Sequence, residues 1–218
     1  MLLRFNKHPN DLPSVCPASG CHEDFNPVHA DICRKGGVVN RRHDYIKVIL
    51  AKFAEKAFGV GSTVIEPLIG ILDPSAKEMI SGITTDDARA DVSIRNLMSP
   101  YRTTYIDVCV ISPVCVTNKS YSVAKSISNA ENRKINSYQD RVQKQLGGDF
   151  LPCCMSSGGV LGPSAKKIIN LIVNKLVTNS RDNAADLKRE IKSDISMSLV
   201  KSRVQGLDLD LDLFISVK

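Results

Sequence analysis

Apolar residues recur every three or four positions over four stretches of the chain, which predicts four amphipathic helices. The stretches are residues 44–59, 118–146, 163–179 and 183–204. Asp44 is placed to cap the N-terminus of the first helix, and Gly59 ends it. Pro163 opens the third helix, in the first-turn position that proline favours.

Shorter apolar runs between these helices predict β-strands. They cover residues 62–69, 88–96, 103–112, 149–157 and the alternating stretch 207–216. Pro152 favours the edge of the sheet, because proline cannot donate a hydrogen bond to a neighbouring strand. Residues 70–87 follow neither period, so we expect a loop there. The order of the elements predicts an α/β (α+β) fold, a small mixed sheet flanked by helices.

Two of the predicted strands each place one aspartate among aliphatic residues: Asp91 in RADVSIR and Asp107 in TTYIDVCVIS. Burying an acid in such a strand is costly unless it is paired or bound to a metal. Two acids on paired strands therefore predict half of a Mg²⁺ site built from hard oxygen ligands. Glu66 on the preceding strand and Glu55 on the first helix are alternative third carboxylates.

Metal-assisted phosphodiester hydrolysis also calls for a lysine near the reacting phosphate. The strand itself offers none, since Cys109 stands two residues after Asp107. Lys134 and Tyr138 lie four residues apart on the following predicted helix, so they share one helix face. The residues alone leave two interpretations open: a catalytic lysine, or a solvated charged helix with Tyr138 packed at its edge.

Cysteine and histidine side chains near the N-terminus have the spacing C-x4-C-x7-H-x3-C. They are Cys16, Cys21, His29 and Cys33. Four ligands of these types, paired across short loops, predict a structural Zn²⁺ site. His22 and His43 are alternative ligands. Further along, the glycine-rich stretch 157–162 lacks the P-loop pattern, and we interpret it as a plain strand-to-helix turn.

Composition adds a moderate positive charge, with 29 Lys and Arg against 23 Asp and Glu and a net charge of +6. This balance favours a polyanionic partner, and we expect DNA, with RNA as the alternative. The arginines that we expect to contact phosphates are Arg41, Arg42, Arg133 and Arg141. The chain has no apolar run long enough to span a bilayer and does not begin with a signal peptide. We therefore expect an intracellular protein without a membrane partner.

In chain order the motifs are the cysteine–histidine cluster, RRH at a helix start, A-R-x-D-V-S-x-R, D-V-x-V-x-x-P, K-x3-Y and S-S-G-G…G-P. This order resembles the C-terminal region of non-LTR retrotransposon polyproteins, in which a CCHC zinc knuckle precedes a restriction-like endonuclease of the PD-(D/E)xK type. The resemblance covers the chain from about Cys16 to about Lys175. It implies a zinc knuckle in residues 1–43, a nuclease core in 44–180 and a C-terminal helix and tail in 181–218.

The resemblance also implies a role for each matching residue. Asp91 matches the aspartate of the P-D motif, Asp107 the second Mg²⁺-binding acid, and Lys134 the catalytic lysine, with Tyr138 completing K-x3-Y. This chain departs from the family pattern at Ala90, where proline is usual, and at Cys109, where a lysine is expected on the strand.

We therefore expect a metal-dependent endonuclease domain that nicks target DNA in the nucleus, derived from a retroelement and normally fused to a reverse transcriptase. The first alternative is an inactive nucleic-acid-binding module, made of the zinc knuckle and the basic helix of a retroelement fragment. The second is a globular interaction protein with neither activity.

Overall fold

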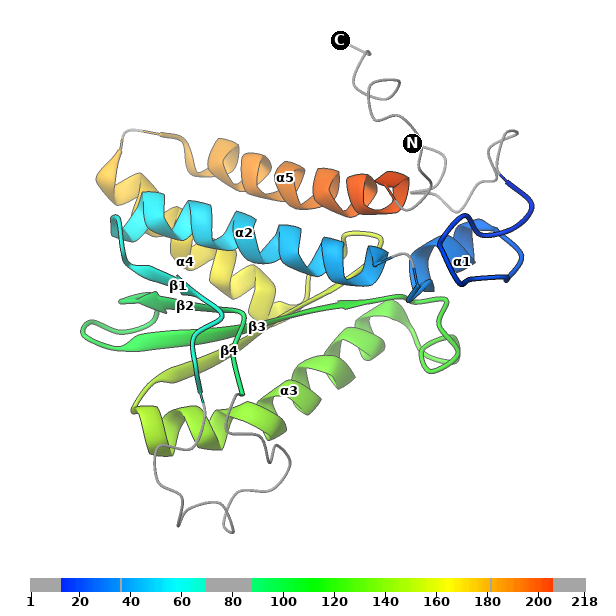
Figure 1. The fold of residues 1–218 in the computed structure, drawn as a ribbon. Coiled ribbons are helices and arrows are strands. Elements are labelled where there is room, and N and C mark those ends of the chain that lie inside the picture. Colours follow the sequence, from blue (N-terminus) through cyan, green and yellow to red (C-terminus); the bar gives the residue numbers. More distant parts are fainter. Residues whose placement is uncertain (1–12, 36, 70–87, 181, 206–218) are drawn as a thin grey trace.

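The computed structural model describes residues 13–35, 37–69, 88–180 and 182–205 (Figure 1). The loop expected at 70–87 and the strand expected at 207–216 lie outside the described residues. In the described part, the elements in chain order are α1 (Pro27–Ile32), α2 (Val38–Phe58), β1 (Thr63–Ile65), β2 (Val92–Arg95), β3 (Thr103–Ile111), α3 (Val123–Leu146), β4 (Asp149–Ser156), α4 (Pro163–Asn179) and α5 (Ala184–Gln205).

The four strands form one mixed sheet in the order β1-β2-β3-β4. The pairs β1–β2 and β2–β3 are antiparallel, and β3 and β4 run parallel. A parallel pair needs a long crossover, and here α3 supplies it. The prediction that Pro152 lies on an edge strand is confirmed, since β4 ends the sheet.

Helices cover both faces of the sheet (Figure 1). Among the described elements, helices α2, α4 and α5 pack together on one face of the sheet, and α3 lies on the other. The apolar sides of the first three helices share one core with the inward residues of β2, β3 and β4. The fold is therefore mixed α/β, a four-stranded mixed sheet flanked by helices, as the sequence pattern predicts.

Several element boundaries differ from the prediction. Helix α2 begins at Val38, not at the expected cap Asp44, because Val38 and Arg42 are buried and extend its inner face. Its N-cap is Gly37, in the left-handed region at φ 67°. Helix α3 begins at Val123, where the Ser122 side chain accepts a hydrogen bond from the Lys125 backbone N–H at 3.2 Å.

Helix α5 belongs to the main core. Its buried apolar residues pack in the same cluster as those of α2 and α4. They are Leu187, Ile191, Ile195 and Leu199. The domain boundaries predicted near residues 43 and 180 stay a prediction.

The turn before α4 requires a glycine. A Cβ built on Gly162 would lie 2.6 Å from Glu131 Oε1 and 2.7 Å from Ile127 Cγ2 on α3, and 2.9 Å from the Cys154 carbonyl on β4. These contacts are shorter than van der Waals distances, and one of them is to backbone, which cannot rotate away. Gly162 therefore lets α3, β4 and the start of α4 approach one another closely.

The substitution Gly162→Ala should lower the free energy of unfolding by about 1–3 kcal/mol, because the methyl group forces the start of α4 away from α3 and β4. Urea denaturation measures the change. The matched control is Gly158→Ala in the same loop, where the nearest atom to a new Cβ is 3.7 Å away. Equal stability of the Gly162 variant and the wild type would contradict the packing described.

Candidate functional site

The candidate site is built around an ion pair between β3 and α3. Lys134 Nζ lies 2.8 Å from Asp107 Oδ2, and the side chains are 25% and 8% exposed. The ammonium of Lys134 is the main compensation for the buried carboxylate of Asp107. Burial raises the pKa of Asp107, and the nearby charge of Lys134 opposes that rise only in part.

Lys134 stays a cation in this pair. Burial alone would lower its pKa, but the charge and the hydrogen bond of Asp107, together with the charges of Tyr138 and Cys109, outweigh that effect, and the pKa is raised. Its Nζ also lies 5.5 Å from the centroid of the Tyr138 ring, within cation–π range. The Tyr138 ring in turn packs against Phe150 of β4, with centroids 5.5 Å apart. The two residues of K-x3-Y therefore share one helix face beside Asp107, as predicted.

Asp91, immediately before β2, contacts the backbone of Val108 on β3. Its Oδ2 accepts a hydrogen bond from the Val108 backbone N–H at 2.6 Å. The same oxygen lies 3.0 Å from His43 Nε2 of α2. The hydrogen bond to Asp91 raises the pKa of His43, although burial opposes it. The structure thus brings Asp91, at the entry to β2, together with Asp107 on the adjacent strand β3.

Glu66 joins the site through its backbone. Its N–H donates to the Asp91 carbonyl at 2.9 Å, while its carboxylate lies 2.6 Å from Lys47 Nζ of α2. Glu66 has a φ of 54°, a left-handed conformation that is strained for a long side chain. Lys47 also contacts Asp44 at 3.1 Å. Burial disfavours the charge of Lys47, but its two acidic partners outweigh that effect and raise its pKa.

The alternative third carboxylate, Glu55, is not part of the site. It lies three turns along α2 from His43, about 18 Å at 1.5 Å per residue. There its carboxylate accepts a hydrogen bond from Thr63 Oγ1 at 3.0 Å. Of the two alternatives left open by the sequence, the structure brings only Glu66 beside Asp91.

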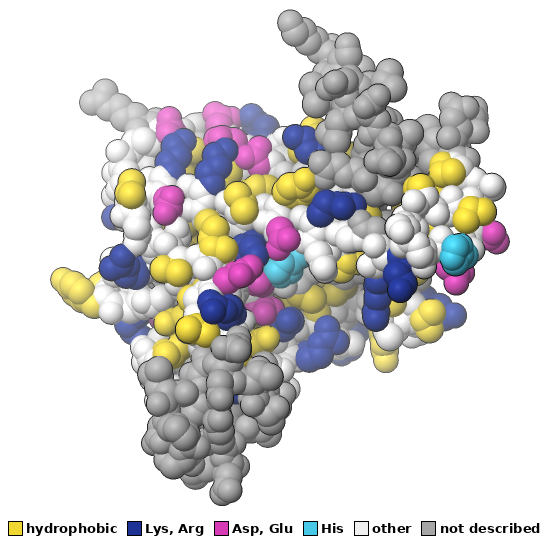
Figure 2. Space-filling model, in the orientation of Figure 1, with side chains coloured by type: hydrophobic (Ala, Val, Ile, Leu, Met, Phe, Trp, Pro, Cys, Tyr) yellow, Lys and Arg dark blue, Asp and Glu magenta, His cyan; other side chains and the backbone are white. Residues whose placement is uncertain are grey.

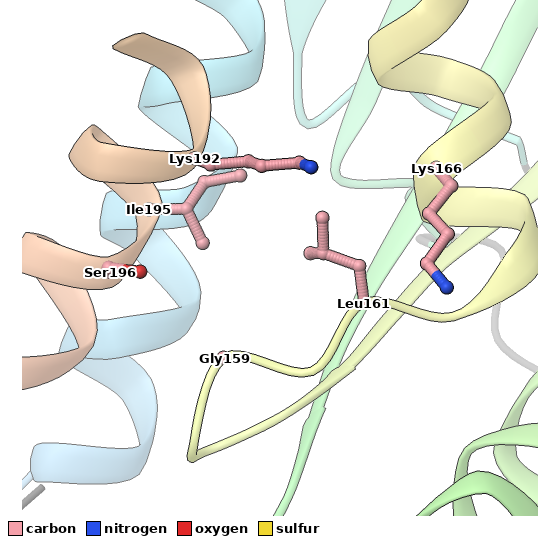
Figure 3. A pocket seen from close by; sticks show the side chains of 6 residues that line it. All are labelled: Gly159, Leu161, Lys166, Lys192, Ile195 and Ser196. Atoms are coloured by element: carbon pink, nitrogen blue, oxygen red, sulfur yellow. The ribbon is translucent and has the colours of Figure 1, made fainter. Parts of the chain in front are cut away.

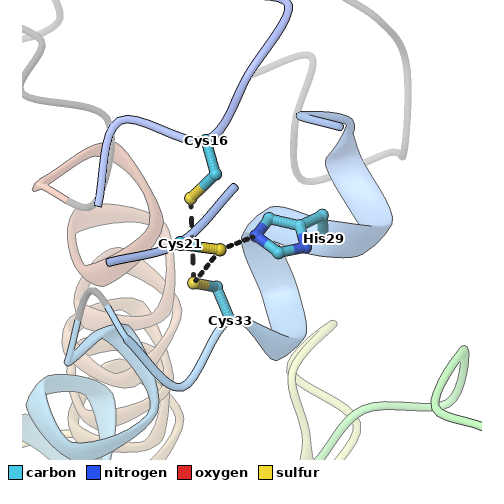
Figure 4. A group of neighbouring side chains, drawn as sticks. All are labelled: Cys16, Cys21, His29 and Cys33. Carbon is cyan, nitrogen blue, oxygen red and sulfur yellow. Dashed lines mark hydrogen bonds between the residues drawn. The ribbon is translucent and has the colours of Figure 1, made fainter. Parts of the chain in front are cut away.

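The cysteine–histidine cluster forms a compact group around α1 (Figure 4). The four ligand atoms lie within 4.8 Å of one another. The contacts are 3.8 Å between the sulfurs of Cys16 and Cys33, 3.9 Å between those of Cys33 and Cys21, and 3.4 Å from Cys21 Sγ to His29 Nε2. Tetrahedral zinc with Zn–S bonds of about 2.3 Å separates two sulfurs by about 3.8 Å. The group could hold a metal ion such as zinc, which confirms the predicted ligand set.

The alternative prediction, that His22 or His43 is a zinc ligand, is wrong. His22 is exposed and lies outside the group, and His43 bonds to Asp91 instead. His43 and Lys47 are the functional residues that the sequence reasoning missed, since the charged stretch RRHDYIK gave no indication of which side chains turn inward. Their i, i+4 spacing, which places both on one face of α2, is the signal that could have found them.

Two of the four predicted phosphate-contacting arginines are buried, which corrects that prediction. Arg42 is 3% exposed; its Nη1 lies 3.1 Å from Asp31 Oδ1 and donates to the Asp31 carbonyl at 2.9 Å. Asp31 Oδ2 accepts a hydrogen bond from Ser157 Oγ at 2.6 Å, so this network fastens α1 to the sheet. Arg141 is 1% exposed within α3. Arg133 is exposed, and Arg41 is partly exposed.

A shallow pocket of about 220 Å³ lies between the glycine-rich turn and α5 (Figure 3). Its lining residues are Gly159, Leu161, Lys166, Lys192, Ile195 and Ser196. The two lysine ammonium groups point to separate places, with Leu161 between them, so they do not converge on one anion. The N-terminus of α4 is occupied too, because Glu131 Oε1 accepts a hydrogen bond from the Ser164 backbone N–H at 2.9 Å.

The face drawn in Figure 2 gathers acidic side chains and a histidine near its centre, with lysine and arginine side chains around them. Among the residues that the structure describes, no helix is both long and apolar enough to cross a membrane. No family model matches this chain, and a search of curated proteins finds no match either.

The pKa of His43 should lie above 6.5 in the folded protein, which an NMR titration of its ring resonances measures. Asp91→Asn should bring it to 6.5 or below, because burial then dominates. Asp44→Asn, at a longer contact of 3.4 Å, should lower it less. Because its folded-state pKa is raised, protonated His43 stabilises the fold. This stabilisation is complete below the pKa of histidine in the unfolded chain, and it is lost as the pH rises through the folded-state pKa. Titration of His43 at or below 6.5 in the wild type would contradict this geometry.

The purified chain should contain one zinc per molecule by elemental analysis, and Cys33→Ser should lose it. Because Asp31 ties α1 to Arg42 and Ser157, zinc loss should raise hydrogen exchange in α1 and at the start of α2 more than in α4. The matched control is Cys115→Ser, outside the group, which should keep its zinc. Substoichiometric zinc after metal-replete expression would rule out the site.

Proposed function

We propose that the protein is a metal-dependent DNA endonuclease domain with a restriction-endonuclease-like core of the PD-(D/E)xK type. The observation that carries the proposal is the placement of Asp91, immediately before β2, beside Asp107 on the adjacent strand β3, with Lys134 2.8 Å from Asp107. The four-stranded mixed sheet flanked by helices is the architecture that the motif resemblance implies. The zinc knuckle packed against the core supports the same proposal.

The donor set fits Mg²⁺. Asp91 and Asp107 offer carboxylate oxygens, the hard ligands that this ion prefers, and the negative charge of Asp91 acts on the buried Asp107. These two residues would hold the ion, with Glu66 as a third carboxylate once released from Lys47. A bound Mg²⁺ would polarise a phosphoryl oxygen and lower the pKa of a coordinated water.

The raised pKa of Lys134 fixes the role that we assign to it. A protonated lysine cannot serve as the general base, so Lys134 binds the scissile phosphate and stabilises the negative charge that develops there. Asp107 and Tyr138 hold its ammonium in place from two sides. His43 orients Asp91 through Nε2 and, when protonated, adds a positive charge beside the same phosphate.

Binding of DNA would draw on the net charge of +6 and on exposed basic side chains, Arg133 and the partly exposed Arg41 among them. A DNA substrate would place the protein in the nucleus. The retroelement origin and fusion to a reverse transcriptase rest on the motif resemblance alone.

One observation favours the second candidate, an inactive nucleic-acid-binding module. Each carboxylate of the site already has a basic partner. Asp91 lies beside His43, and Asp107 lies beside Lys134. The third carboxylate, Glu66, pairs with Lys47 of α2. Such a closed set of ion pairs needs no metal to compensate it. Cleavage distinguishes the two candidates, because both predict salt-sensitive DNA binding.

The zinc-loaded chain should nick supercoiled plasmid in the presence of Mg²⁺ and not when Mg²⁺ is omitted. Asp107→Asn should abolish nicking, and Lys134→Ala should slow it by about 100-fold or more, because a preorganised charge is lost. The matched controls are Asp140→Asn and Lys144→Ala, an exposed pair on the same helix, which should nick at the wild-type rate. Circular dichroism confirms that each variant is folded. DNA binding without nicking would favour the second candidate.

A further inference from the structure

The turn between β2 and β3 carries an aromatic side chain that the candidate site does not use. Tyr101 is 100% exposed, and Met98 in the same turn is 36% exposed. The hairpin reaches beyond the sheet at the left of Figure 1, and hydrophobic side chains project at that place in Figure 2. Tyr101 therefore contributes nothing to the core of the described fold.

The backbone of this turn is strained at the tyrosine. Tyr101 has a φ of 63°, in the left-handed region, where a bulky residue is an outlier and glycine is the usual choice. The turn is nevertheless held firmly: the Tyr101 N–H donates to Asn96 Oδ1 at 2.7 Å, and the Asn96 N–H donates to the Arg102 carbonyl at 2.8 Å. Strain that the surroundings enforce in this way is typical of functional positions.

Two arginines stand on either side of the turn. Arg102 donates to the carbonyls of Gly147 and Gly148 at 3.1 Å each, and Arg95 donates to the carbonyl of Gly61. These bonds fix both guanidinium groups without neutralising them. Asp149, 3.4 Å from Arg102, offsets one of the two charges. The tip thus presents an exposed ring beside a fixed positive charge.

We propose that Tyr101 stacks on an unpaired base of the nucleic acid, with Arg95 and Arg102 beside the flanking phosphates. This inference rests on the proposed function. Residue 101 precedes Asp107 by six positions, about 20 Å along an extended chain. That length corresponds to about six base pairs of duplex, so one nucleic acid can reach both the tip and the acidic site. Aromatic stacking accepts any base, because every base has a π-face.

The test compares two DNA duplexes that differ in one unpaired 2-aminopurine, with Mg²⁺ omitted so that the zinc-loaded chain binds without cleaving. At one fixed salt concentration, the wild-type chain should bind the bulged duplex at least about fivefold more tightly than the fully paired one. Binding should also change the 2-aminopurine fluorescence. Tyr101→Phe should keep the preference, and Tyr101→Ala should bind both duplexes equally. Tyr121→Ala, at another exposed tyrosine, is the matched control and should behave as the wild type.

Tyr101→Gly adds a readout that a structural role would not give. It should lose the preference while raising the melting temperature, because glycine relieves the left-handed strain. An unchanged preference in Tyr101→Ala overturns the proposal, and so does a wild-type chain that binds neither duplex. If Tyr101→Ala instead changes the oligomeric state, the turn binds a second copy of the chain, and the stacking proposal is overturned as well. Plasmid nicking by Tyr101→Ala at the wild-type rate leaves the proposed endonuclease standing in each of these cases.

Discussion

Compensation of one buried carboxylate is the constraint on which the rest of the site depends. Asp107 lies in the middle of β3 with its side chain 8% exposed, and only a nearby positive charge makes that position tolerable. Lys134 supplies it from α3, the helix that the parallel pairing of β3 and β4 requires as a crossover. A buried ion pair seldom stabilises a fold more than well-packed apolar residues would. Under the proposed function, the pair serves chemistry at the acid rather than stability.

Helix α2 connects this site to the cysteine–histidine cluster. Within two turns, three basic side chains of this helix contact three different acids. Arg42 contacts Asp31 of α1, and His43 contacts Asp91. Lys47 contacts Glu66, whose backbone N–H bonds to the carbonyl of Asp91. Neighbouring helix positions point about 100° apart, so one short helix segment can serve several partners. The cysteine–histidine cluster and the acidic site are thus both connected to α2.

The sequence predicts much of this arrangement. Apolar periodicity places α4 and α5 within one residue of their observed bounds, and alternation places β3 equally well. The approach of Asp91 to Asp107 was also predictable, since a short turn favours pairing of their two strands. The place of Lys134 rested on the motif resemblance, because the residues alone left two interpretations open. The burial of Arg42 and Arg141 was not, because a charged residue turns inward only when a distant acid or helix receives it. Glu66 illustrates the same point: its left-handed backbone depends on pairing with Asp91, which no local pattern encodes.

The most direct test of the central claim is metal binding at the two aspartates, measured on zinc-loaded protein. Electron paramagnetic resonance with Mn²⁺, which accepts the same oxygen ligands as Mg²⁺, counts the bound ions without any need for cleavage. We expect one Mn²⁺ per wild-type chain, displaced by excess Mg²⁺. We expect none in the folded Asp91→Asn, Asp107→Asn double variant. A wild-type chain that binds no Mn²⁺, or a double variant that binds it equally well, would contradict the account.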